Sequence, residues 1–180
     1  MFSRLFGKNA AYEAGESLFA AASERSRAPI FYEAMGVPDT VEGRFEMTSL
    51  HVWLILRTLK GDDRAVRNVA QKLFDAMFSS FDDALRELGV GDLIVGKKIR
   101  KMAENFYGRV QAYDAAMETG AGETGGDALA GALARNIYES SDPAIAAGLA
   151  DYVRAQASAI NAQAQADIVR GDVSFIEVQR

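Results

Sequence analysis

Cysteine is absent from the 180 residues, and histidine occurs once, as His51. Without thiols the chain has no disulfide and no thiolate metal site, and a single imidazole excludes His-rich metal centres. Proline is also scarce, and its three residues leave the long periodic segments uninterrupted. The sequence therefore excludes a disulfide-stapled fold and a metal centre built from histidine or cysteine.

Long apolar runs and an excess of positive charge are lacking too. The most apolar run, residues 52–56, is far shorter than the roughly 20 residues that a membrane-spanning helix needs. Lys and Arg number 20 against 25 Asp and Glu, so the net charge is −5. A general nucleic-acid binder needs a basic surface that displaces counterions from phosphates. We therefore expect no DNA partner, although a local basic patch is compatible with this balance.

The N-terminal segment has two Phe, one Leu and two basic residues within its first eight positions. It is too short for the apolar part of a secretory signal and has no small-residue cleavage site. We expect residues 1–9 to be a flexible terminus or to touch a membrane surface. The expected location is cytoplasmic, with peripheral contact at the inner membrane as the alternative.

Apolar residues make up 49% of the chain and recur at spacings of three and four, the helical period. Charged residues make up 25%, an ordinary share for a globular domain. We predict an all-α, single-domain bundle of about six to eight helices over residues 10–170, with an Ala-rich helical pair at its C-terminal end. Residues 171–180 are predicted to be a loose tail or one edge strand.

The first five predicted helices precede the Gly-rich segment at residues 119–126, which is the predicted linker. They cover residues 10–26, 29–35, 40–59, 64–88 and 92–117. Asp39 is the predicted cap of the third helix, with Glu42 completing a capping box. Ser79 and Ser80 are a predicted break in the fourth. The third helix has apolar residues on nearly every face, so we expect it to be the centre of the core.

Beyond the linker the composition shifts towards alanine. Helices are predicted over residues 127–139 and then from Asp142-Pro143, an N-cap and first-turn signal, to about residue 170. Alanine buries little apolar area. We therefore expect this segment to be weakly held, or to serve as a surface for another chain.

Three patterns invite a functional reading. Residues 91–98 nearly match a phosphate-binding loop, but Lys98 replaces the hydroxyl that would hold magnesium and no strand precedes the segment. Asp82, Asp83 and Glu87 support an alternative function, a helical enzyme or binding protein for prenyl or quinone-type lipids that uses an acidic metal cluster. Because Arg86 stands where that pattern needs a carboxylate, we do not favour it. His51, in the most apolar helix, is expected to be a hydrogen-bonded core residue.

A basic helix side follows the Gly89–Gly91 hinge. It consists of Lys97, Lys98, Arg100 and Lys101. Such a run is either a solvated helix face or a patch for a negatively charged partner, such as ribosomal RNA, an anionic lipid or an acidic subunit.

Three stretches carry a resemblance to a known family. They are Phe31–Asp39 with Gly43–Met47 and Leu50–Leu54, then Leu73–Phe78 with Phe81–Asp92, and then Val95–Lys98 through Met102 to Phe106–Arg109. In this order they resemble the ubiquinol–cytochrome c chaperone domain, closely over residues 27–117 and loosely over the C-terminal helices.

The resemblance implies an assembly chaperone without catalysis or cofactor. Its expected client is newly made cytochrome b or another subunit of the ubiquinol–cytochrome c reductase (bc1) complex. Mitochondrial relatives act with a small partner protein and associate with the ribosome, which makes both of these candidate partners. Because no transit-type presequence is seen, we expect a bacterial member.

A chaperone for a membrane protein needs an exposed apolar groove with charged rims, whereas the alternative enzyme needs an enclosed cavity lined by acids. We expect the partner-binding surface at the segment 82–92 and the start of the next helix. The candidate residues are Asp82, Asp83, Arg86, Glu87, Asp92, Lys97, Lys98, Lys101 and Arg109. The alternative is that many of these charges form internal ion pairs that fix the hinge.

Overall fold

Helix α3 (Val41–Leu56) is the centre of the computed structural model, which describes residues 2–119, 121–122 and 126–177. Every residue from Leu50 to Ile55 is buried, Trp53 among them. α3 packs against α1 (Phe2–Ser26), α4 (Arg64–Glu87) and two helices of the C-terminal half. The prediction that this helix is surrounded by others is confirmed.

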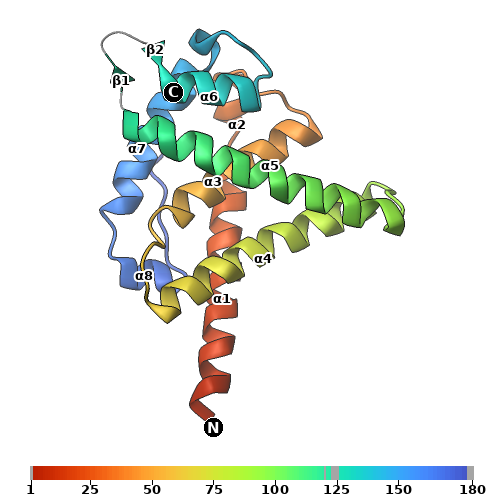
Figure 1. Ribbon diagram of the computed structural model, residues 1–180, viewed down its shortest axis with the longest axis vertical. Helices are drawn as coiled ribbons and strands as arrows, with labels where there is room; N and C mark the ends of the chain where they lie inside the picture. The colour runs from red at the N-terminus through yellow and green to blue at the C-terminus, as the bar shows by residue number, and fades with distance from the viewer. Residues whose placement is uncertain (1, 120, 123–125, 178–180) are drawn as a thin grey trace.

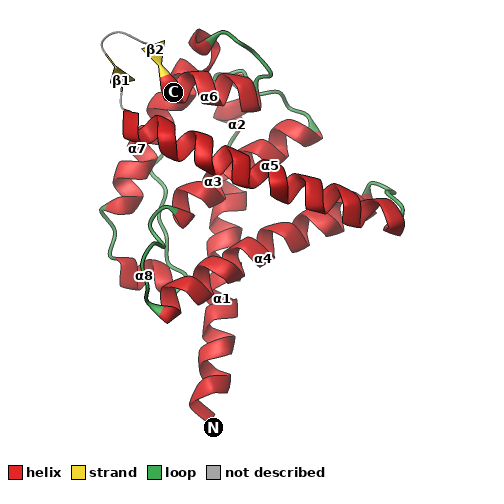
Figure 2. Ribbon diagram, in the orientation of Figure 1, coloured by secondary structure: helices red, strands yellow, loops and turns green. Residues whose placement is uncertain are grey.

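The described residues are helical almost throughout (Figure 2). The chain begins with α1 and the short α2 (Pro29–Glu33), and after α3 it forms the long pair α4 and α5 (Asp92–Thr119). α4 and α5 meet at a turn at the right edge of Figure 1 and diverge from it. In the Gly-rich segment two-residue strands, β1 (Ala121–Gly122) and β2 (Gly126–Asp127), pair antiparallel. The all-α, single-domain class is confirmed, with eight α-helices in the described part of the chain.

α1 is longer than its sequence suggested. It begins at Phe2, not near residue 10, so the backbone of residues 2–9 is helical. Flexibility or membrane contact of this segment stays a prediction. Once packing has formed a helix, each further residue without proline is added at little cost, which accounts for the extension. α1 crosses α4 closely at Gly15 (Figure 1), where an added Cβ would lie 2.6 Å from the Cβ of Lys72.

Two predicted helix boundaries are corrected. Thr40, not Asp39, caps α3, because its hydroxyl accepts a hydrogen bond from the Gly43 N–H at 3.0 Å. Asp39 instead pairs with Arg44 at 2.7 Å. The predicted break at Ser79 and Ser80 is wrong as well, since α4 is continuous to Glu87. Phe78 and Phe81 are both buried, so core packing on either side of the serines maintains the helix.

The Ala-rich half is part of the core, contrary to the expectation that it is weakly held. It comprises α6 (Ala128–Ile137), the short 3-10 helix η1 (Pro143–Ala146), α7 (Ala147–Asn161) and α8 (Gln165–Val169). Ala130, Leu133 and Ala134 of α6 are buried. Small side chains let these helices approach closely, which compensates for the little area that each alanine buries. The predicted single helix to residue 170 is divided by a turn at residues 162–164.

Residues 171–177 are neither loose nor a strand. They form an extended segment that returns along α7, with Val173 and Phe175 packed against the core. Among the helices of the described residues, none has the length and apolarity needed to cross a membrane.

Candidate functional site

A half-open groove of about 750 Å³ lies where the start of α3, the end of α4, α5 and the end of α6 meet. Its apolar lining comprises Val41, Phe45, Leu85, Leu88, Val90, Met102 and Ile137. Lys98, Lys101 and Arg109 of α5 line the same groove, with Glu42 and Glu46 of α3 on the other side. The groove therefore combines apolar area with charges of both signs.

An ion pair joins α3 to α5 in this groove. Arg109 contacts Glu46 through both Nε and Nη2, each at 2.5 Å from a carboxylate oxygen. Each of the two side chains is only about one-fifth exposed. Burial raises the pKa of the Glu46 carboxyl, and the Arg109 charge opposes this rise. Arg109, a predicted partner-binding residue, thus holds the groove together from within.

A second set of charges joins α4 to α5 at their turn. Arg86 donates to Asp82 at 2.5 Å and also bonds Asp92. These two carboxylates raise the pKa of the Arg86 guanidinium. Gly89, with φ of +81°, allows the chain to reverse between the helices. Internal pairing, the alternative raised for the candidate charges, is therefore what these three residues do.

The remaining candidates divide between several surfaces. Lys98 and Lys101 line the groove, and Lys101 also lies 3.4 Å from Glu104. Lys97 and Asp83 are exposed and line neither groove. Glu87 lines a smaller groove of about 490 Å³ between α1, α3 and α4. The structure thus brings Lys98, Lys101 and Arg109 together, and leaves the other candidates elsewhere.

Exposed apolar side chains at the α4–α5 turn are the feature that sequence reasoning missed. Leu93 is 90% exposed, Leu88 is 60% and Ile94 is 53%. Leu88 also lines the groove, whereas Leu93 and Ile94 lie outside its lining. A signal was present, since Leu93 and Ile94 lie off the buried stripe of α5 that Val95 begins. Apolar side chains clustered this openly are typical of a surface that a partner covers.

The acidic residues Asp82, Asp83 and Glu87 do not come together around a cavity. Glu87 lines the smaller groove, and neither of the two grooves includes Asp82 or Asp83. Within the described residues no group of three or more His, Asp or Glu side chains is placed to hold a metal ion. What the site offers is apolar burial and charge pairing.

His51 is buried in α3, as predicted. One ring nitrogen, Nδ1, lies 2.7 Å from the Met47 carbonyl oxygen and the other 2.7 Å from the Tyr152 hydroxyl. Burial lowers its pKa to about 4. It is therefore a neutral, fully bonded core histidine.

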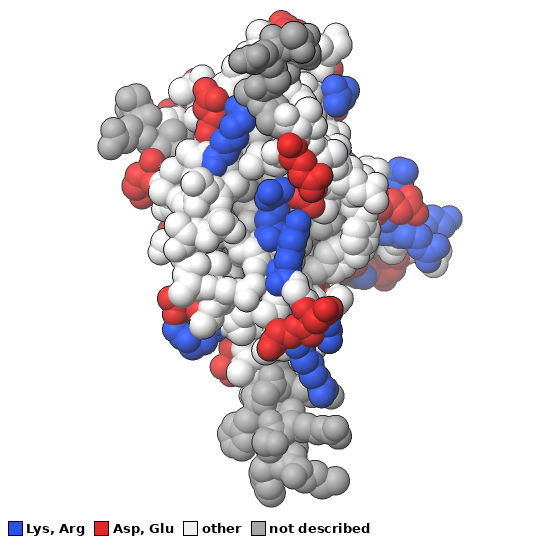
Figure 3. All heavy atoms as spheres, turned by 60° about the vertical axis from the view of Figure 1, so that its left-hand side comes forward, with Lys and Arg blue, Asp and Glu red and all other residues white. Residues whose placement is uncertain are grey.

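Charges of both signs are interspersed over the face that the left-hand side of Figure 1 presents (Figure 3). Uncharged areas separate them there, so this face has no large patch of one sign.

Comparison with known proteins gives consistent results. Residues 33–175 match the family model described as ubiquinol–cytochrome C chaperone. The crystal structure of the Cbp3 homolog from Brucella abortus is similar with a TM-score of 0.83 and 37% identity, covering 98% of this chain and 97% of that chain.

Two curated relatives are ubiquinol–cytochrome c reductase complex assembly factor 1 of Xenopus laevis and of Mus musculus. They are 29% and 30% identical over 84 residues, which is 47% of this chain and 42% and 28% of the relatives. The chain thus matches less than half the length of these curated relatives.

Proposed function

Because this chain belongs to the ubiquinol–cytochrome c chaperone family, we propose that it is an assembly chaperone that binds newly made cytochrome b, or another bc1 subunit, without catalysing a reaction. Its relatives from Xenopus laevis and Mus musculus are named as assembly factors of the reductase complex. Contacts with the ribosome and with a small partner protein stay predictions from the resemblance.

The observation that carries the proposal is the groove between α3, α4, α5 and α6. A client helix can place its apolar face on Phe45, Leu85 and Met102, which line it. Leu93 and Ile94, exposed at the α4–α5 turn outside the groove lining, offer a client further apolar area. Lys98 and Lys101 can then pair with acidic client side chains and fix its orientation.

The test is charge reversal within the groove. Lys98→Glu with Lys101→Glu should lower recovery of cytochrome b with the tagged protein about tenfold, the change expected for about 1.4 kcal/mol. The matched control, Lys97→Glu with Arg100→Glu, makes the same charge change on the same helix but outside the groove lining. Recovery should be measured beside the thermal unfolding midpoint of each variant.

Salt supplies a second arm, because it screens ion pairs between exposed charges. Capture by the wild type and the control should weaken as salt rises, while capture by the groove variant should change little. Equal recovery of cytochrome b from all three proteins at low salt would remove the groove from the proposal.

A further inference from the structure

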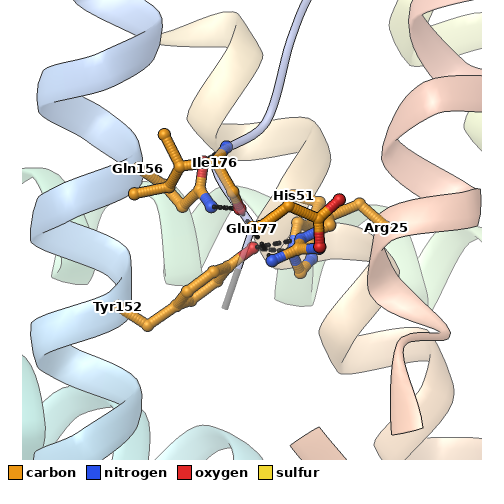
Figure 4. Close-up of polar contacts among 6 residues, drawn as sticks. All are labelled: Arg25, His51, Tyr152, Gln156, Ile176 and Glu177. Atoms are coloured by element: carbon orange, nitrogen blue, oxygen red, sulfur yellow. Dashed lines mark hydrogen bonds and ion pairs between the residues drawn. The ribbon is translucent and has the colours of Figure 1, made fainter. Parts of the chain in front are cut away.

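The C-terminal tail, residues 173–177, lies between α1 and α7 and over α3 (Figure 4). Side chains from all three helices meet it there. We call these side chains the tail seat. They are Arg25 of α1, His51 of α3, Tyr152 and Gln156 of α7, and Gln163, which follows α7. Figure 4 shows Gln156 and Arg25 approaching Ile176 from opposite sides.

Two glutamine side chains bind the main chain of the tail. Gln163 accepts from the Ser174 N–H at 2.9 Å and donates to the Ser174 carbonyl at 2.6 Å. Gln156 makes the same pair of bonds with Ile176, at 3.0 Å and 2.7 Å. Residues two apart in an extended chain present N–H and C=O to the same edge. The side-chain amides of Gln163 and Gln156 therefore bind the tail as a neighbouring β-strand would. They contact its main chain only, whatever the side chains of residues 174 and 176 are.

Phe175, between these two residues, supplies the side-chain contact. Its ring lies edge-on to the His51 ring, with centroids 5.5 Å apart. His51 is held in place by the Tyr152 hydroxyl at 2.7 Å, and Phe31 packs against both His51 and Tyr152. By contrast, Ser174, Ile176 and Glu177 are exposed. The tail seat thus recognises an extended backbone and one aromatic ring.

Arg25 completes the seat. Its Nη2 donates to the Ile176 carbonyl at 2.7 Å, and its Nε donates to the Tyr152 hydroxyl at 3.2 Å. The carbonyl of Ile176 consequently has two donors, from α1 and from α7. The contacts of Gln156, Gln163 and Arg25 Nη2 are all made to main-chain atoms of the tail, so a different sequence could make them equally well. Arg25 Nη1 also lies 3.7 Å from the carboxylate of Glu177, and this side-chain contact adds little because Glu177 is 92% exposed.

We propose that the tail seat is a second polypeptide-binding site, which accepts an extended client segment with an aromatic residue between two residues whose N–H and C=O face Gln163 and Gln156. The chain's own tail fills this site at rest. The inference rests on the proposed function, because the client supplies the segment. A client segment that enters must displace the tail, so the tail lowers the apparent affinity of the site for the client.

The test uses the full chain with a tail that can no longer bind. Ser174→Pro with Ile176→Pro removes the two N–H groups that donate hydrogen bonds to the side-chain oxygens of Gln163 and Gln156. All five seat residues remain. Ser174→Ala with Ile176→Ala is the matched control, because it changes the same exposed side chains and keeps both N–H groups. The probe is a labelled synthetic peptide with the sequence of residues 171–180.

The proline variant should bind the peptide at least tenfold more tightly than the alanine control does, as measured by fluorescence anisotropy. Adding Gln156→Leu to the proline variant should abolish the gain, as should replacing the peptide's Phe by Ala. The NMR signal of His51, the single histidine, reports the seat directly. In the free proline variant the pKa of His51 should rise towards its ordinary value of about 6.5. It should fall again when the peptide binds.

Three results would overturn the proposal. If His51 titrates in the proline variant but the peptide does not bind, the seat only packs the tail. If the titration of His51 in the proline variant is the same as in the wild type, the glutamine hydrogen bonds are not what holds the tail. Wild-type dimers that are lost in the proline variant would instead assign the seat to exchange of tails between two copies. Lys98→Glu with Lys101→Glu should leave peptide binding unchanged, which separates failure of this site from failure of the groove.

Discussion

His51 has no exposed surface, and its two ring nitrogens lie within hydrogen-bond distance of Met47 and Tyr152. The carbonyl of Met47 can only accept, so Nδ1 carries the proton and Nε2 accepts from the Tyr152 hydroxyl. Burial, together with the nearby positive charge of Arg25, lowers the pKa of His51 to about 4. The ring is therefore neutral in the folded protein over the physiological pH range.

This histidine should make the free energy of unfolding depend on pH. An unfolded histidine has a pKa of about 6.5, so between that value and about 4 the unfolded chain binds a proton that the folded chain does not. Acidification through this window favours the unfolded state, by up to about 3 kcal/mol. Urea unfolding at pH 7.5 and pH 4.5 measures it.

The comparison that isolates His51 is with His51→Gln, whose side chain does not titrate. The loss of stability between the two pH values should be smaller in that variant, since the other titrating groups are common to both proteins. Equal losses in the two proteins would show that the pKa of His51 is the same in the folded and unfolded states.

At the scale of the element, the crossing of α1 and α4 depends on Gly15. An added Cβ there would lie 2.6 Å from the Lys72 Cβ and 2.7 Å from the Lys72 carbonyl carbon, closer than real atoms approach. Gly108, in α5, has nothing within 4 Å of its added Cβ. Glycine to alanine is therefore obstructed by a neighbouring helix at Gly15 and unobstructed at Gly108.

Gly15→Ala should destabilise the protein by about 1–3 kcal/mol, because the helices must move apart. Gly108→Ala should stabilise it by up to about 1 kcal/mol, because alanine is the better helix former and nothing obstructs it. Thermal or urea unfolding of both variants gives the sign directly. A stabilised Gly15→Ala protein would mean that the crossing is looser than described.

Helix boundaries illustrate what sequence reasoning can and cannot reach at this scale. The N-cap predicted at Asp142 is confirmed, since its side chain accepts a hydrogen bond from the Ala144 N–H. Asp39 and Thr40 are adjacent and both capable of capping, so local chemistry does not decide between them. In the structure Asp39 pairs with Arg44, and the Thr40 hydroxyl accepts the hydrogen bond from Gly43.

For the whole molecule, the burial of α6 and α7 implies that the protein unfolds as one unit. Both helices contact α3, and the tail connects α7 with α1. Far-UV circular dichroism and Trp53 fluorescence should therefore report the same midpoint in urea. An earlier far-UV transition, with Trp53 still buried, would indicate that the Ala-rich half melts separately.

The sequence by itself determined the all-α class, the central place of the Trp53 helix and the family. Each follows either from local periodicity or from a long ordered pattern of motifs, and both are properties of the sequence alone. Only the tertiary structure decided which of the candidate charges meet. Arg86 is held by Asp82 and Asp92, and Arg109 by Glu46, which is 63 residues away.

The same distinction applies to the two proposed binding surfaces. Lys98 and Lys101 were identifiable as a basic side, but the apolar area beside them comes from α3, α4 and α6 and exists only when these helices assemble. The tail seat was not foreseeable, because Gln156 and Gln163 are ordinary polar residues until the fold brings Ser174 and Ile176 against them. Contacts between residues distant in sequence leave no local periodicity, and that is the physical reason that only the folded chain reveals them.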